Sequence, residues 1–221
     1  MPARMVVVGL ALCLVPGAAR AEAPRTFGKS SAQILAMGSE KWMDYQGTKA
    51  GQSTGAMTEG MEAYRGALRW RNDGLSRRSK AAGRVGKLRG HLVELTRGLV
   101  EIGSYRTGGG TIWANIGAGA LSASEEVLYP LLGGPAKKPR SKPHTTAEVK
   151  RALEELRQLT ETRSREPDVT PAAHAEALKS FDRVRKSWAE TEKIAATFDR
   201  AGSDNILGFC LEQIRTAHGD S

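Results

Sequence analysis

A group of basic side chains close to two aromatic residues, Tyr64 and Trp70, has the clearest potential for chemistry in this sequence. The segment from Arg65 to Arg106 contains eleven lysine and arginine residues against three acidic residues. Guanidinium and ammonium groups bind phosphates, and an aromatic ring can stack on a base or a sugar. The residues that we expect to bind an anion are Arg77, Arg78, Lys80, Arg84, Lys87 and Trp70.

The positive charge is concentrated in this segment and in the run Lys137–Lys142, which adds four more basic residues. The whole chain has a formal net charge of +9 at pH 7. A local patch favours attraction to an anionic surface, so we expect an anionic envelope component or an acidic protein as partner. Nucleic acid fits the charge, but no nucleic-acid-binding motif accompanies it. The alternative is a solvated helix face whose charges keep the protein in solution.

Histidine and methionine side chains provide a different hypothesis, a haem or metal site in the core of a helical bundle. His91 and His174 lie beside apolar helical positions, and either could act with Met57 or Met61. However, no histidine pair has the spacing of a metal site, and Cys-x-x-Cys-His is absent from the sequence. We therefore assign no metal ligand and no cofactor.

The sequence also lacks a recognisable catalytic arrangement, so we assign no catalytic residue and expect a binding role rather than an enzyme. Cys210 lies on the apolar face of the last helix, where a cysteine usually behaves as a small hydrophobic residue. Adjacent carboxylates such as Glu125 and Glu126 point about 100° apart on a helix, and Glu125 is expected to cap a helix with Ser122. A cell-envelope hydrolase with an unrecognised carboxylate pair remains a second alternative.

The first 21 residues have the pattern of a secretory signal peptide. Arg4 precedes an apolar run from Met5 to Val15, and Ala19-Arg20-Ala21 is a small-x-small cleavage sequence. The run is shorter than the roughly 20 residues of a membrane-spanning helix, so we expect no transmembrane helix in the mature chain. Leu12 before Cys13 disfavours the alternative of a lipid anchor. We therefore expect a periplasmic or secreted protein.

The elements that position these side chains are predicted to be helices. Capping pairs indicate helix starts at Ser30 with Gln33 and at Thr145 with Glu148, and Thr170-Pro171 indicates another. Val85, Leu88, Leu92, Leu95, Leu99 and Ile102 recur at the 3-4 spacing of a packed helix. Because alternating strand patterns are absent from the sequence, we predict an all-α fold, a helical bundle of about five to seven helices.

Glycine divides the predicted bundle into two halves and predicts breaks in the first. Residues 28–134 hold 20 of the 25 glycines, which predicts a loop at 46–56 and a turn at Asn72-Asp73-Gly74. Gly108–Gly110 should end a helix, after which two short helices are expected to begin at Thr111 and Ser122. The second half is poor in glycine and amphipathic.

The predicted organisation is a signal peptide (1–21), a Gly-rich helical region (22–132), a basic Pro/Gly linker (133–145) and an amphipathic helical region (146–221). Whether the two helical regions pack as one domain is left open, as is a homodimer through the leucine-rich seam. The functional hypothesis is an exported, non-enzymatic helical-bundle protein that binds an anionic partner or acts as a scaffold in the bacterial cell envelope. The periplasmic haem- or metal-binding bundle is its first alternative.

Overall fold

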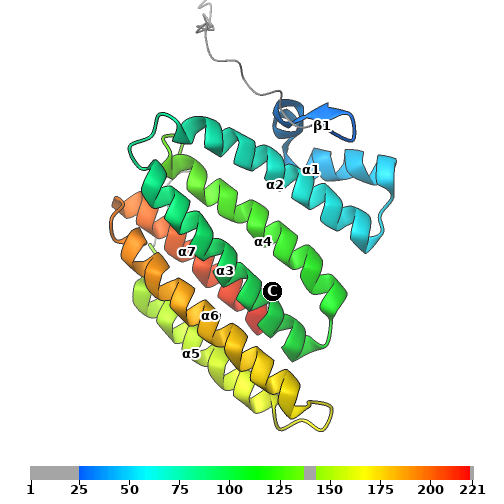
Figure 1. Ribbon diagram of the computed structural model, residues 1–221, viewed down its shortest axis with the longest axis vertical. Coiled ribbons are helices and arrows are strands. Elements are labelled where there is room, and N and C mark those ends of the chain that lie inside the picture. Colours follow the sequence, from blue (N-terminus) through cyan, green and yellow to red (C-terminus); the bar gives the residue numbers. More distant parts are fainter. Residues whose placement is uncertain (1–24, 137–142, 220–221) are drawn as a thin grey trace, which may run out of the picture.

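The computed structural model describes residues 25–136 and 143–219, which form seven helices and one short hairpin (Figure 1). Over these residues the fold is the predicted all-α helical bundle. The helices are α1 (Ser31–Ala50), α2 (Thr54–Ser76), α3 (Ala82–Thr107), α4 (Gly110–Leu131), α5 (Thr146–Arg163), α6 (Pro171–Ala195) and α7 (Arg200–His218). The hairpin of β1 (Arg25–Thr26) and β2 (Lys29–Ser30) was not predicted from the sequence, because strands of two residues leave no alternating pattern.

The helix starts that depend on local hydrogen bonds agree with the sequence prediction. Ser30 and Gln33 form a complete capping box at the start of α1, and Thr145 and Glu148 form another at the start of α5. The side chain of Thr170 accepts a hydrogen bond from the Ala173 amide at the start of α6. Gly108 ends α3 in the left-handed conformation (φ 70°), as expected for a glycine after a helix.

Of three breaks predicted from glycine and turn residues, the loop at 46–56 is shorter than predicted, at residues 51–53, and the other two are wrong. Most of the segment 46–56 is helical, because α1 continues to Ala50 and α2 begins at Thr54. Asn72-Asp73-Gly74 lies inside α2, and α4 is one helix through Ser122 rather than two short ones. In each case the helix extends further than the weak helix propensity of glycine and asparagine suggests. The glycine that does interrupt a helix is Gly38, with φ 77°, inside α1.

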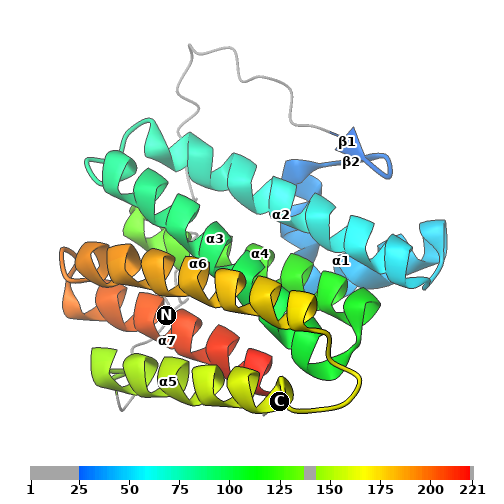
Figure 2. The same cartoon turned by 60° about the horizontal axis from the view of Figure 1, so that its bottom comes forward.

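The larger hydrophobic core surrounds α3, which packs against α4, α6 and α7 (Figure 2). The predicted seam from Val85 to Ile102 faces inward in this core, with each apolar side chain at most 3% exposed. The second half of the chain, α5–α7, therefore packs directly on the first half. Where α3 meets α6, a Cβ added at Gly98 would lie 2.5 Å from a methyl group of Val184, so the two helices can approach only because residue 98 is glycine.

A smaller core lies between α1 and α2. It contains Ile34, Trp42 and Ala67, and the indole of Trp42 donates a hydrogen bond to the Gly60 carbonyl over 2.7 Å. Among the described helices, none is both long enough and apolar enough to cross a membrane.

From α2 onward, successive helices run in opposite directions, so alternate connections gather at the same end of the bundle (Figures 1 and 2). The α2–α3 turn, the α6–α7 turn, the end of α4 and the start of α5 all lie at this end. We call it the basic end, for the residues 77–87 that it carries.

Candidate anion-binding site

The α2–α3 turn presents the basic residues on a tightly hydrogen-bonded backbone. The amide of Arg78 bonds to the Leu75 carbonyl, and the Ala81 amide bonds to the Ser79 hydroxyl. Leu75 packs against the larger core, which fixes the turn to the bundle. The backbone therefore holds the basic side chains at one place on the surface.

Four of the predicted anion-binding residues are exposed and have no ion-pair partner among the residues that the structure describes: Arg77, Arg78, Lys80 and Lys87. Other arginines of α2 and α3, such as Arg69, Arg71 and Arg89, pair with carboxylates of the same chain. The four positive charges at the turn are thus available to an external anion, whereas those neighbouring charges are already balanced.

The other two predicted residues differ from these four. Arg84 donates a hydrogen bond to the Thr197 carbonyl over 2.9 Å, and its guanidinium lies 4.9 Å from the ring centre of Phe198. Its main contacts therefore tie the start of α3 to the α6–α7 turn. Trp70 is half-buried on α2, two helical turns before Arg77 and on the same face.

Acidic side chains close to this end are occupied by internal partners. Asp73 lies 2.9 Å from Arg89, Asp199 caps the Gly202 amide, and Asp204 accepts a hydrogen bond from the His144 amide. The positive charge of the turn is therefore not cancelled by an ion pair with these carboxylates. The basic run of the linker, Lys137–Lys142, lies outside the described residues, as does the expected signal peptide.

A buried polar network, which was not predicted from the sequence, joins α2, α3 and α4 close to this site. The carboxylate of Glu125, 1% exposed, lies 3.0 Å from the Arg89 guanidinium and accepts a hydrogen bond from the Asn72 side-chain amide over 2.8 Å. Glu125 is thus a buried ion-pair partner and not the helix cap that we predicted. Its spacing from Leu121 and Leu128 on the apolar face was the available signal.

The histidines considered for a metal or haem lie apart from each other. His174 is at the start of α6, where its Nδ1 lies 3.1 Å from the Tyr105 hydroxyl. His91 is close enough to Glu190 to lower the pKa of that carboxyl, although the hydrogen bond to Lys193 lowers it more. Sixteen residues of α6, about 24 Å of helix, separate Glu190 from His174. Within the described residues no group of three His, Cys, Asp or Glu side chains converges as metal ligands would.

Cys210 is fully buried in the larger core, and burial raises the pKa of its thiol to about 12. Because the thiolate is the nucleophilic form, we expect Cys210 to resist a thiol reagent at pH 8 in the native protein and to react fully in urea. The absorbance released by a disulfide reagent measures both states. Rapid native labelling, at the rate of a free thiol, would contradict this burial.

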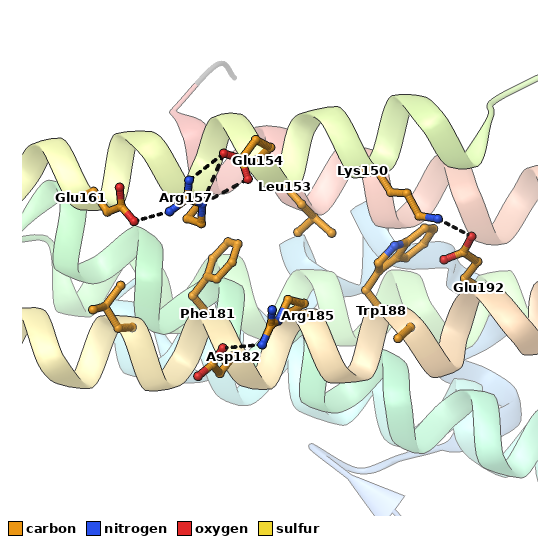
Figure 3. Close-up of a pocket in the computed structure, with 12 residues that line it drawn as sticks. Lys150, Leu153, Glu154, Arg157, Glu161, Phe181, Asp182, Arg185, Trp188 and Glu192 are labelled. Atoms are coloured by element: carbon orange, nitrogen blue, oxygen red, sulfur yellow. Dashed lines mark hydrogen bonds and ion pairs between the residues drawn. The ribbon is translucent and has the colours of Figure 1, made fainter.

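A groove of about 620 Å³ lies between α5 and α6 (Figure 3). Leu153, Phe181 and Trp188 form its apolar floor, and charged side chains of both helices form its rims. Its charged side chains pair along their own helix or across the groove, as in the 2.9 Å contact between Lys150 and Glu192. It differs from the basic end in having both signs of charge.

Its fold and candidate site together place the protein in the class of all-α helical bundles. Over the described residues, one end carries basic side chains without ion-pair partners, and a groove with an apolar floor lies between two helices. No protein-family model matches the chain, and neither a curated protein nor a solved structure gives a significant match. The function must therefore be inferred from the residues and geometry of this chain.

Proposed function

We propose that this chain is an exported, non-enzymatic binding or scaffold protein of the bacterial cell envelope, and that its basic end binds an anionic partner. The observation that carries the proposal is the set of four exposed, unpaired basic residues on the α2–α3 turn and the first turns of α3. Placement in the envelope comes from the signal-peptide pattern of residues 1–21.

The geometry favours binding of an extended or multivalent anion over binding of a single small ion. The four exposed side chains are spread over the α2–α3 turn and the first turns of α3, and none of them lines the groove, so each can reach a different anionic group. Trp70, half-buried on the same face of α2 as Arg77, offers an aromatic surface beside them. Such binding depends on charge and falls steeply as salt rises.

Reversing the four charges tests the proposal. We expect R77E/R78E/K80E/K87E to weaken binding of residues 22–221 to inorganic polyphosphate by about tenfold or more at low salt, because four attractive charges become repulsive. We also expect a shallower dependence of log affinity on log salt, by roughly one unit for each phosphate that a basic side chain no longer neutralises. Titration calorimetry at several salt concentrations measures both quantities.

A matched control separates the site from the net charge. K41E/R165E/K186E/R215E reverses four exposed basic residues that lie on α1, the α5–α6 turn, α6 and α7. Its net charge equals that of the first variant, but the turn is intact, so we expect affinity close to that of the unmodified chain. Equal losses in the two variants, or binding that ignores salt, would rule out a site at the basic end.

A further inference from the structure

The groove between α5 and α6 has an apolar floor of Leu153, Phe181 and Trp188, each at most 8% exposed, and more exposed rims. α5 packs chiefly against α7, and α6 packs chiefly against α3, so the two helices leave Phe181 and Trp188 along the bottom of an open channel. Leu178 at the α6 rim is 37% exposed, although it is a large apolar side chain. A partner that covered Leu178 would remove this apolar area from water, which is favourable.

The charges on the α5 rim have an order that identifies a partner. Lys150, Glu154, Arg157 and Glu161 follow one another at steps of four, three and four residues, with signs plus, minus, plus, minus. If a second copy of this series runs in the opposite direction beside the first, each charge lies opposite a charge of the other sign. An antiparallel copy of α5 would place Lys150 opposite the partner's Glu161 and Glu154 opposite the partner's Arg157.

The α6 rim has the same property. Leu178, Asp182, Arg185 and Ala189 follow at the same steps of four, three and four residues. Reversal pairs Asp182 with the partner's Arg185 and sets Leu178 against the partner's Ala189. Both rims are therefore self-complementary in the antiparallel direction, in charge and in apolar contact.

The centres of the two series lie at nearly the same level along the groove. In Figure 3, the labelled Glu154 and Arg157 on α5 face the stretch of α6 that carries Asp182 and Arg185. A single two-fold axis that lies in the plane of contact and crosses both helices can therefore bring the opposite charges of both rims together. We propose that this groove binds a second copy of the chain, with α5 on the partner's α5 and α6 on the partner's α6, both antiparallel.

The existing ion pairs at the rims are exposed or partly exposed, including the pair of Lys150 with Glu192 across the groove. Arg157 pairs with Glu154 and Glu161 along α5, and Arg185 pairs with Asp182 along α6, all of them well exposed. Exposed pairs of this kind contribute little and exchange easily. In the dimer the partner's charged side chains would lie between those of the first chain. Because the contact has two-fold symmetry, every favourable pair between the two copies occurs twice.

Charge reversal and restoration test the proposed pairing. We expect residues 22–221 to form a concentration-dependent dimer in sedimentation velocity, and Arg157→Glu to weaken it by about tenfold or more, because like charges then face each other twice. The double variant E154R/R157E restores a self-complementary rim and should restore the dimer. Arg151→Glu is the control, since it breaks a similar exposed pair, with Glu155, on α5 but outside the groove.

Cysteine cross-linking tests the register. Residues 178 and 189 are about 16 Å apart along α6, too far for a disulfide within one chain. Oxidised L178C/A189C should therefore give a covalent dimer, whereas L178C alone and the equally spaced K179C/E190C should not. Cys210 is fully buried and does not interfere.

Three results would each overturn the dimer. These are a chain that stays monomeric at high concentration, an R157E variant that associates like the unmodified protein, and cross-linking of K179C/E190C as efficient as that of L178C/A189C. Circular dichroism of each variant checks that it is folded. The proposal does not depend on anion binding, because the basic end and the groove share no residue.

Discussion

Arg89→Ala is expected to lower the free energy of unfolding by about 3–5 kcal/mol, because it leaves a buried carboxylate without its charge partner. The side chain of Glu125 is 1% exposed, and Arg89 lies 3.0 Å from it while also lying 2.9 Å from Asp73. After the change, the Asn72 amide is the remaining hydrogen-bond donor to this carboxylate from a neighbouring helix. Urea unfolding followed by circular dichroism measures the decrease.

Two further variants show whether the cost comes from the buried charge. Arg69→Ala removes an arginine that is 58% exposed and lies 3.9 Å from Asp73, so we expect a decrease of less than about 1 kcal/mol. The double variant R89M/E125L removes both charges and should recover much of the stability that R89A removes. Similar decreases in R89A and R69A would show that the network contributes little.

The same network has a consequence for the basic end. Asn72 and Arg89 lie on the two helices that the turn 77–81 connects, and Glu125 joins both of them to α4. The network therefore ties α2 and α3 to α4 on both sides of the turn.

The sequence predicted best those features that depend on neighbouring residues. The capping boxes at Ser30 and Thr145 and the left-handed Gly108 follow from hydrogen bonds and backbone freedom within a few residues. The inward face of α3 follows from the spacing of its apolar side chains. The fold class could therefore be predicted from local signals summed along the chain.

Glycine misled the prediction because many glycines here lie inside helices, some facing open space, as Gly55 and Gly74 do, and others at close contacts. An added Cβ would lie 2.2 Å from the Trp113 ring at Gly103 and 2.9 Å from the Gln46 side chain at Gly60. These glycines lie within helices and allow a large side chain or a neighbouring helix to approach. Sequence alone does not distinguish such a glycine from one that ends a helix, since the distinction depends on the partner helix.

The candidate site was predictable in part for a related reason. Arg77, Arg78, Lys80 and Lys87 are close in sequence, so their proximity required no knowledge of the fold. The contact of Arg84 with Thr197 crosses 113 residues of chain, and no local pattern indicates it. The order of charges along α5 can be read in the sequence. Whether these charges form an exposed rim depends on which face of α5 packs against α7.

Trp42→Ala is expected to remove about 3–5 kcal/mol of stability, and the effect should be concentrated in α1 and the hairpin. Trp42 is fully buried in the smaller core, where it packs with Ile34 and Ala67 and lies 6.0 Å from the Phe27 ring. This core is separate from the larger one around α3. Amide hydrogen exchange should therefore show reduced protection in α1, with protection retained in α3 and α6.

Trp42→Phe separates packing from hydrogen bonding at the same position. It keeps an aromatic ring but removes the donor to the Gly60 carbonyl, so we expect a smaller decrease in stability, about 1–3 kcal/mol. If W42A instead removed protection throughout α3 and α6, the two cores would unfold as one cooperative unit. If the reduced protection were confined to α1, the basic end and the α5–α6 groove would rest on a bundle that remains folded without α1.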